Sequence, residues 1–278
     1  MQRTDPGNGV TRLAIIGAGR LGTAIAAALR AHAGFELTGP LGRDDLLGRE
    51  DLLGRDDPLA LATVDGVPSA DVVLLCVPDR EIAGAAAALR PGPLVGHCSG
   101  ATGLEPLAPH EAFSLHPLMT VARGGADFTG ATAAIDAGTE RALAVARLIA
   151  HALAMETVRV RPEDRVAYHA AASIASNFLV TLEAAAERLA ASAGVSRQAL
   201  APLVRASVEN WVALGPEQAL TGPLARGDAQ TVARQRAVLT ERTPELIPLF
   251  DALADATQAL AAAAPTVQEP APTELAPA

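Results

Sequence analysis

The stretch RLAIIGAGRLGTAIAAALRAHAG, residues 12–34, decides the fold of this chain. Its residues 13–16 are a short apolar and partly β-branched run, which indicates a buried strand. Gly17, Gly19 and Gly22 follow, and then an alanine-rich segment that is typical of a helix. A strand, a G-x-G-x-x-G loop and a helix in this order predict the start of a dinucleotide-binding βαβ unit.

Each glycine has its own role in such a loop. Gly17 permits the tight turn, Gly19 lets the backbone approach a pyrophosphate, and Gly22 allows the helix to pack closely on the strand. The helix N-terminus adds N–H groups and a partial positive charge for the phosphates. The alternative is a glycine turn in a sheet that binds no nucleotide. The cofactor-binding residues predicted in this loop are Gly17, Ala18, Gly19, Arg20, Leu21 and Gly22.

Strands and helices alternate through the N-terminal half of the chain. Residues 71–78 are the most apolar of the predicted strands and indicate burial on both faces, and Val77 and Pro78 at their end are further predicted cofactor contacts. A helix is predicted over 79–92. This alternation indicates an α/β protein with a parallel, doubly wound Rossmann sheet. The other predicted strands cover residues 35–41, 93–98, 112–116 and 130–138.

A six-residue unit is repeated three times at residues 41–58, as LGRDDL, LGREDL and LGRDDP. The end of the second strand selects between NAD and NADP in this fold. No acid stands there, and the first charged residue is Arg43, which suits the 2′-phosphate of NADP by a forked contact. We therefore predict NADP rather than NAD. The later units, with Arg49 and Arg55, are interpreted as an expanded surface loop, and a lid over the adenosine end is the alternative.

The pattern changes near residue 161. Pro162 opens a helical stretch of about 30 residues that stops at Gly194, and the chain reads as helical from there to about residue 264. We predict a Rossmann domain over 11–161 and an all-helical domain for substrate binding and dimerisation over 162–264. The ends, 1–10 and 265–278, are predicted to be disordered.

Composition excludes several classes of protein. The 278-residue chain has a formal net charge of −9 and no basic stripe, so a nucleic-acid partner is not expected. The N-terminus lacks the pattern of a signal peptide, and no run of about 18 uncharged apolar residues predicts a membrane span. Its two cysteines indicate neither a metal site nor a disulfide framework. A soluble, cytoplasmic protein with a small-molecule substrate is expected.

Five further segments carry a resemblance to a known family: DVVLLCVPDREI, HCSGATGLEPL, SLHPL, YHAAASIASNFLVTL and LTGPLARGD. Over roughly residues 11–262, the chain resembles bacterial proteins that join a Rossmann-like half to the helical domain of unknown function 2520. The wider relatives are NADP-dependent oxidoreductases of the 6-phosphogluconate dehydrogenase-like superfamily, including pyrroline-5-carboxylate reductases. The resemblance implies a nucleotide-binding domain, a helical domain and a homodimer, but no particular substrate.

Two predicted strand ends carry candidate catalytic groups. His97 and Ser99 stand where one strand ends, and ligands of such sheets collect at the carboxyl ends of strands. Ser99 is equally compatible with a capped turn. His116 ends the next strand, where it can protonate a carbonyl oxygen as hydride arrives, and a structural bond to the backbone is the alternative. We assign a catalytic role to Ser99 and His116 and substrate contact to His97.

The long helix adds a polar stripe of His169, Ser173 and Asn177, spaced i, i+4 and i+8. Such a stripe needs partners, either a substrate or other protein groups. In the related dehydrogenases this helix lines the cleft opposite the nicotinamide. That resemblance implies substrate contact for His169 and Asn177, with His169 also a candidate proton carrier and Ser173 beside them. Arg226 is predicted to hold a substrate carboxylate or phosphate.

The chain contains no lysine, whereas many dehydrogenases of the wider superfamily use one as an acid–base or polarising group. A proton donor here must therefore be His, Ser, Tyr or water. The sequence predicts an NADP-dependent oxidoreductase acting on a small polar, anionic carbonyl or imine compound. The alternative is a non-catalytic dinucleotide sensor or partner-binding protein, which the missing lysine favours and the clustered His, Ser and Asn oppose.

Overall fold

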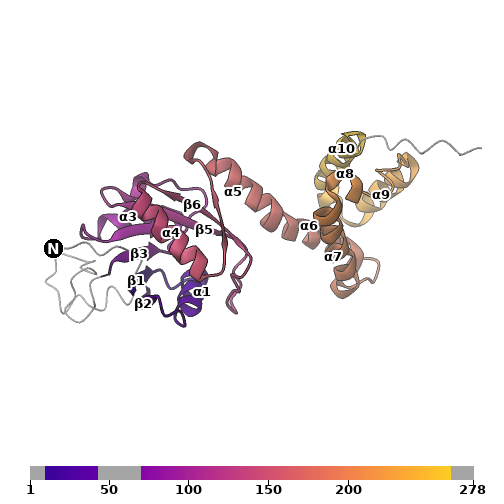
Figure 1. Cartoon of the computed structure of the whole chain (residues 1–278). Coiled ribbons are helices and arrows are strands. Elements are labelled where there is room, and N and C mark those ends of the chain that lie inside the picture. Colours follow the sequence, from indigo (N-terminus) through magenta and orange to yellow (C-terminus); the bar gives the residue numbers. More distant parts are fainter. Residues whose placement is uncertain (1–9, 43–69, 264–278) are drawn as a thin grey trace, which may run out of the picture. The chain divides into compact units, whose positions relative to one another are not determined.

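The computed structural model describes residues 10–42 and 70–263 (Figure 1). The chain divides into two compact units, Met1–Ser176 and Asn177–Ala278, and each is described by itself. The predicted contact of Arg43, the interpretation of the repeat from residue 43 onward, and the disorder predicted at the two ends lie outside the described residues, apart from Val10. The predicted domain boundary near residue 161 stays a prediction.

A seven-stranded sheet forms the centre of the first unit. Its strands lie in the order β2-β1-β3-β4-β5-β6-β7, and every neighbouring pair except β5–β6 is parallel. The predicted α/β Rossmann fold is confirmed. The strands are β1 (Thr11–Ile16), β2 (Phe35–Leu41), β3 (Val72–Leu75), β4 (Leu94–His97), β5 (Ala112–Leu118), β6 (Thr132–Ala137) and β7 (Glu156–Arg159).

The pair β5–β6 is antiparallel, in a sheet that was predicted to be parallel. Residues 119–131 join these strands without a helix. A parallel pair needs a crossover connection that returns the chain to the starting edge, and that connection is usually a helix. Without one, the chain runs back beside β5 in the opposite direction, so the sheet is mostly parallel.

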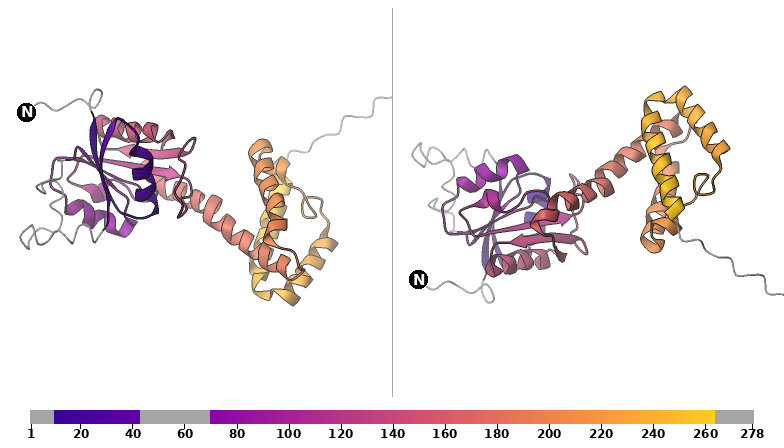
Figure 2. Two further views of the ribbon diagram at one scale, coloured as in Figure 1. Left: turned by 90° about the horizontal axis from the view of Figure 1, so that it is seen from below. Right: turned by 90° about the horizontal axis from the view of Figure 1, so that it is seen from above.

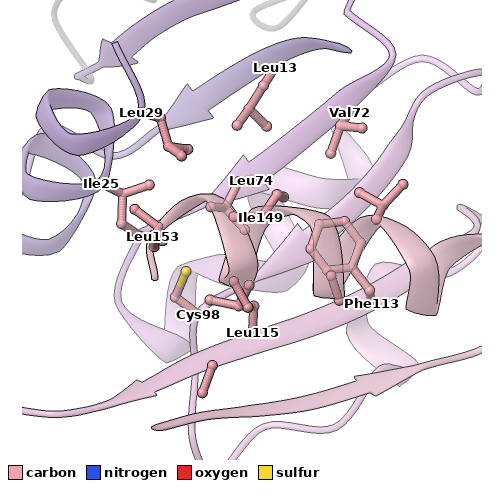
Figure 3. Close-up of a cluster of buried hydrophobic side chains, with 14 of the residues drawn as sticks. Leu13, Ile25, Leu29, Val72, Leu74, Cys98, Phe113, Leu115, Ile149 and Leu153 are labelled. Atoms are coloured by element: carbon pink, nitrogen blue, oxygen red, sulfur yellow. The ribbon is translucent and has the colours of Figure 1, made fainter. Parts of the chain in front are cut away.

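Helices cover both faces of the sheet (Figures 1 and 2). Successive side chains of a strand point to opposite faces, so Leu13 and Ile15 of β1 belong to one buried cluster and Ala14 and Ile16 to another. Figure 3 shows the first cluster, in which side chains of two helices gather around those of the strands. The first cluster contains side chains of α1 (Arg20–Leu29) and α4 (Glu140–Ala152), and the second those of α3 (Asp79–Ala87).

Two elements of the first unit had no counterpart in the sequence prediction, which named nothing between residues 139 and 160. Helix α4 begins at Thr139, whose hydroxyl accepts a hydrogen bond from the Ala142 N–H at 3.1 Å. Strand β7 follows it at the edge of the sheet, and all four of its residues are exposed. An edge strand has no second neighbour to bury it, so ETVR lacks the apolar run by which the other strands were recognised.

The predicted long helix is present but is not α-helical throughout. A 3₁₀ turn (η2, Pro162–Asp164) leads into α5 (Arg165–Ser173), a π-helical segment (η3, Ile174–Phe178) and α6 (Leu179–Ala191). Gly194 follows with φ +76°, a left-handed conformation that glycine adopts readily and that ends the helix.

The π-helical segment changes the helix within the predicted polar stripe. His169 and Ser173 both lie in α5, whereas Asn177 lies in the π-helical segment. Substrate contact by these residues stays a prediction.

The described part of the second unit is entirely helical beyond its turns, as predicted. Asp228 caps α9 by accepting a hydrogen bond from the Thr231 N–H at 3.0 Å. One helix in the described part of the chain, Pro244–Ala263, is long and apolar enough to cross a membrane by length and composition. Asp251 within it pairs with Arg236 of α9 at 2.8 Å. The helices are α7 (Arg197–Leu214), α8 (Pro216–Ala219), α9 (Ala229–Arg242) and, after the short turn η4 (Pro244–Leu246), α10 (Ile247–Ala263).

Candidate functional site

The glycine-rich loop leaves β1 and enters α1 with the geometry that its glycines require. Gly17 has φ +112°, and a Cβ there would lie 2.3 Å from the carbonyl oxygen of Cys76. A Cβ on Gly22 would lie 2.0 Å from the carbonyl oxygen of Gly17. Both positions exclude a side chain, because these neighbours are backbone atoms. The predicted roles of Gly17 in the turn and Gly22 in close packing are thus matched by the structure.

Gly19 differs from its two neighbours, because a Cβ there would meet no atom of the described chain within 4 Å. It is the N-cap of α1, offers no side chain to cap the helix, and lies between the exposed residues Ala18 and Arg20. No side chain at Gly19 therefore covers the first backbone N–H groups of α1. Such a helix N-terminus attracts phosphate groups, so the loop fits a pyrophosphate.

The loop opens where the order of strands reverses. β1 lies between β2 and β3, which is the switch point at which ligands of doubly wound sheets bind. Val77 and Pro78 follow β3 on the other side of this point, and Pro78 is exposed. On the β2 side, the Leu41 carbonyl accepts a hydrogen bond from the Gly17 N–H at 2.8 Å. The end of β2 is thereby held beside the loop, as the cofactor prediction requires.

Ser99 organises the loop that follows β4. Its hydroxyl donates to the Asp79 carboxylate at 2.7 Å and accepts from the N–H groups of Ala101 and Thr102 at 3.2 and 3.0 Å. Its side chain is almost fully buried. These contacts match the capped turn that was the alternative for this residue, and a catalytic role for Ser99 stays a prediction.

His97 is fully buried at the end of β4. Its Nδ1 accepts a hydrogen bond from the Ser99 N–H at 3.2 Å, which makes Nε2 the protonated nitrogen, and Nε2 donates to the Gly103 carbonyl at 2.8 Å. Burial lowers its pKa, which keeps the ring neutral. Both ring nitrogens hold the loop, so the predicted substrate contact by His97 would require one of these bonds to break.

Cys98 follows His97 and lies beside Cys76, with 3.7 Å between the two sulfur atoms. The hydrogen bond with Cys76 and burial both raise the pKa of the Cys98 thiol. A protonated, buried thiol is a poor nucleophile, so Cys98 does not fit a catalytic role.

His116, Tyr168 and His169 come together at the end of β5. His116 Nδ1 lies 2.8 Å from the Tyr168 hydroxyl, and the rings of His116 and His169 meet edge to face with their centres 6.0 Å apart. Gly100 lies against both imidazoles, since a Cβ there would be 3.0 Å from His116 Nε2 and 2.8 Å from His169 Cδ2. Two of the predicted catalytic residues are therefore brought together.

The environment of His116 keeps its ring neutral at pH 7. Burial, and then the neighbouring His169 and Arg165, lower its pKa to about 4. A neutral imidazole has one N–H and one lone pair. We assign the Tyr168 hydroxyl as the donor to Nδ1, and with it the proton of the His116 ring to Nε2, the atom beside Gly100.

Arg165 is a site residue that the sequence reasoning missed. It is the first residue of α5, is almost fully buried, and donates to the Ser114 hydroxyl and to the Ser99 carbonyl, both at 2.9 Å. It therefore joins α5 to the ends of β4 and β5. The spacing i, i+3 and i+4 from Arg165 to Tyr168 and His169 was the signal that could have revealed it.

Two predicted substrate residues lie in the second unit. Asn177 is exposed in the π-helical segment, and Arg226 is exposed in the turn before α9. Gly222 and Gly227, both with positive φ, shape that turn. Ser173, by contrast, lies in the first unit one helical turn beyond His169 and is half-buried.

A mostly parallel sheet with a G-x-G-x-x-G loop at its switch point defines a Rossmann-type, dinucleotide-binding class of domain. Residues 4–120 match the family described as Rossmann-like domain, and residues 131–257 match domain of unknown function 2520. The chain therefore joins a segment that matches a Rossmann-like domain to one that matches domain of unknown function 2520, in this order. No functionally curated protein matches this sequence.

Solved structures share this fold across nearly the whole chain. A Bacteroides fragilis protein provisionally assigned as an NADP oxidoreductase is 22% identical with a TM-score of 0.71, covering 90% of this chain and 98% of its own. A Streptomyces aurantiacus imine reductase is 17% identical with a TM-score of 0.58, covering 91% and 98%. The 1-pyrroline-5-carboxylate reductase of Streptococcus pyogenes is 14% identical with a TM-score of 0.55, covering 90% and 99%.

Proposed function

We propose that this protein is a nicotinamide-dinucleotide-dependent oxidoreductase acting on a small polar, anionic carbonyl or imine compound. One observation carries the proposal: the open Gly19 loop follows β1, and His116, with Tyr168 and His169 against it, lies near the carboxyl end of β5, which runs parallel to β1 in the same sheet. The carboxyl ends of parallel strands meet at the same edge, so a pyrophosphate site and a group able to move a proton share that edge. The names of the structural neighbours support the same class of reaction.

The chain's own residues would act as follows. When bound, the reduced nicotinamide supplies a hydride. The bare backbone at Gly19 and the N-terminus of α1 hold the phosphates, and Val77 and Pro78 line the switch point beside them. His116 donates a proton from Nε2 to the carbonyl oxygen or imine nitrogen of the substrate, and His169 lies beside His116. Ser173 contacts the substrate. Asn177 and Arg226 stay predicted contacts for an anionic group.

NADP is the proposed form of the cofactor. β2 ends at Leu41 beside the loop, and the two residues that follow in the sequence are Gly42 and Arg43. An acid that could bind a ribose 2′-hydroxyl is absent from 38–43, at the end of β2, whereas an Arg at this point favours a 2′-phosphate.

A thermal-shift panel of NADPH, NADH and adenosylmethionine tests the cofactor. A ligand that binds only the folded state at a hundredfold excess over its Kd stabilises it by about 2.7 kcal/mol. NADPH should stabilise most, NADH less and adenosylmethionine not at all. Arg43→Ala should remove the preference for NADPH, and Arg49→Ala, the same letter of the next repeat unit, is the matched control. Stabilisation by none of the three would exclude the oxidoreductase proposal.

We also propose a homodimer built through the second unit. Within the described residues of that unit, only Leu239 and Thr243 are buried. Trp211 and Val212 of α7 are 57% and 71% exposed. So small a buried core does not stabilise a helical domain of this size, and a second copy of the chain supplies the missing cover.

Trp211→Glu is expected to weaken this dimer about 100-fold, because a central aromatic anchor would be replaced by a buried charge. Sedimentation velocity over a range of protein concentrations measures the change. Gln198→Glu, which adds the same charge at the exposed start of α7, should leave the dimer intact. A wild-type protein that sediments as a monomer at all concentrations would contradict the proposal.

A reducing cytoplasm is the proposed compartment. Cys76 and Cys98 are free thiols, and their sulfur atoms lie 3.7 Å apart. Thiols this close persist as thiols in a reducing compartment and are prone to pair in an oxidising one.

A further inference from the structure

The hydrogen bond between Tyr168 and His116 joins residues 52 positions apart in the sequence and gives His116 a second partner for proton movement. The Tyr168 hydroxyl lies 2.8 Å from Nδ1, on the opposite side of the imidazole ring from Nε2. Nε2 has no hydrogen-bond partner in the part of the chain that the structure describes. The two ring nitrogens therefore have different tasks: Nδ1 is held by the protein, and Nε2 is left for a ligand.

A neutral imidazole cannot readily give up its only proton, because an imidazolate anion would remain. His116 stays neutral near pH 7, since burial and its cationic neighbour oppose an imidazolium. Nε2 can release its proton only if Nδ1 gains one in the same step. The Tyr168 hydroxyl is the hydrogen-bonded proton donor in position to supply it.

Arg165 stands where the resulting charge needs to be stabilised. It lies one helical turn before Tyr168 on α5, and its guanidinium is buried. Its Nε has no hydrogen-bond partner in the described structure, although its other two nitrogens are satisfied by Ser114 and Ser99. Burial raises the pKa of Tyr168, and the charge of Arg165 opposes that rise. A phenolate at Tyr168 would therefore find a fixed positive charge beside it.

We propose that Tyr168 is the proton source for the reaction and that His116 relays its proton, with Arg165 as the positioning residue that stabilises the phenolate; this rests on the proposed function. As hydride reaches the substrate carbon, the substrate oxygen or nitrogen takes the proton from His116 Nε2. His116 Nδ1 takes the proton from the Tyr168 hydroxyl, so the ring ends as its other neutral tautomer. One negative charge is left on Tyr168. A proton from water then enters at His116 Nε2 while Nδ1 returns its proton to the Tyr168 oxygen, which restores the starting tautomer.

The tautomer of His116 is tested without any substrate. The full chain, labelled with ¹⁵N histidine, is examined by NMR at pH 7, and the His116 signals are assigned by their loss in His116→Gln. The relay requires an unprotonated Nδ1 and a protonated Nε2 in the wild type. In Tyr168→Phe, Nδ1 loses its donor and its resonance should shift. A proton on Nδ1 in the wild type would overturn the proposal, because Tyr168 could not then donate to it.

The relay itself is tested with Tyr168→Phe, which removes one hydroxyl from the chain's single tyrosine. The reaction is followed as NADPH consumption with two probes of each class: glyoxylate and pyruvate, and 2-methyl-1-pyrroline and 1-pyrroline-5-carboxylate. On the probe that the wild type reduces best, kcat should fall about 10- to 100-fold, with KM and NADPH affinity unchanged. Val166→Ala, at an exposed position of α5, is the matched control.

The proton inventory, which is the dependence of kcat on the fraction of D₂O in the solvent, distinguishes the relay from a purely structural role of Tyr168. The wild type should show two protons in flight in the transition state, and Tyr168→Phe one. Unchanged kcat in the variant, or the same inventory in both proteins, would overturn the relay. Failure of the proposed function would appear elsewhere, as absence of stabilisation by NADPH in the thermal-shift panel.

Discussion

Replacing His116 with phenylalanine is expected to lower kcat by about 10² to 10⁴-fold, the range for loss of a general acid. The substitution removes Nε2, the atom beside Gly100 that has no hydrogen-bond partner among the described residues, and breaks the 2.8 Å bond with Tyr168. NADPH affinity should be unchanged, because the glycine loop joins β1 to α1, whereas His116 lies in β5. Consumption of NADPH with the best of the four probes measures turnover, and NADPH titration measures affinity.

His116→Gln is the informative companion. A glutamine amide can donate a hydrogen bond but cannot exchange one proton for another across a ring, so turnover should stay close to that of the phenylalanine variant. His151→Gln makes the same change at an exposed position of α4 and should behave as the wild type. Wild-type turnover in His116→Phe would remove this residue from the mechanism.

His116 should also affect how the free energy of unfolding depends on pH. Its pKa is lowered from 6.5 to about 4 by burial, by His169 and by Arg165, so the unfolded chain binds a proton there at a higher pH than the folded one. Stability from this group is therefore fully present above pH 6.5 and is lost as the pH falls from 6.5 towards 4. The free energy of unfolding of His116→Gln should fall less steeply across that window.

Gly19→Ala is expected to weaken NADPH binding about 100-fold, or about 2.7 kcal/mol, without lowering the melting temperature of the free protein. The new methyl group meets no atom of the described chain within 4 Å, so the fold accommodates it. It occupies the bare surface where a pyrophosphate must approach the backbone N–H groups at the start of α1. NADPH titration and thermal unfolding of the free protein measure the two effects separately.

Substitutions of two other glycines serve as comparisons for Gly19→Ala. Gly22→Ala places a Cβ 2.0 Å from the Gly17 carbonyl oxygen and should destabilise the fold itself by about 3 kcal/mol. Gly84→Ala, in α3, meets no atom of the described residues within 4 Å and should stabilise the protein by about 0.5–1 kcal/mol, with NADPH binding unchanged. NADPH affinity preserved in Gly19→Ala would show that the cofactor does not use this loop.

Local sequence patterns were sufficient to predict most strands and helices of the first unit. An apolar run such as VVLL at 72–75, buried at every position, indicates a strand whatever the rest of the chain does. The G-x-G-x-x-G spacing anticipated three distinct glycine environments. Elements without such a pattern were missed: β7 lies at an exposed edge, and the π-helical segment at Ile174–Phe178 looks like any other stretch of helix in sequence.

By itself, then, the sequence determined the Rossmann half, the helical half and the loop that a dinucleotide fits, because periodicity and glycine spacing are local properties. Only the tertiary structure decided how the candidate side chains are used. Both ring nitrogens of His97 form hydrogen bonds within its own loop, and Arg165 donates a hydrogen bond to the Ser99 carbonyl, 66 positions away. Tyr168 was likewise set against His116. Contacts over such separations arise from how α5 packs on the ends of the strands, and no local pattern records that packing.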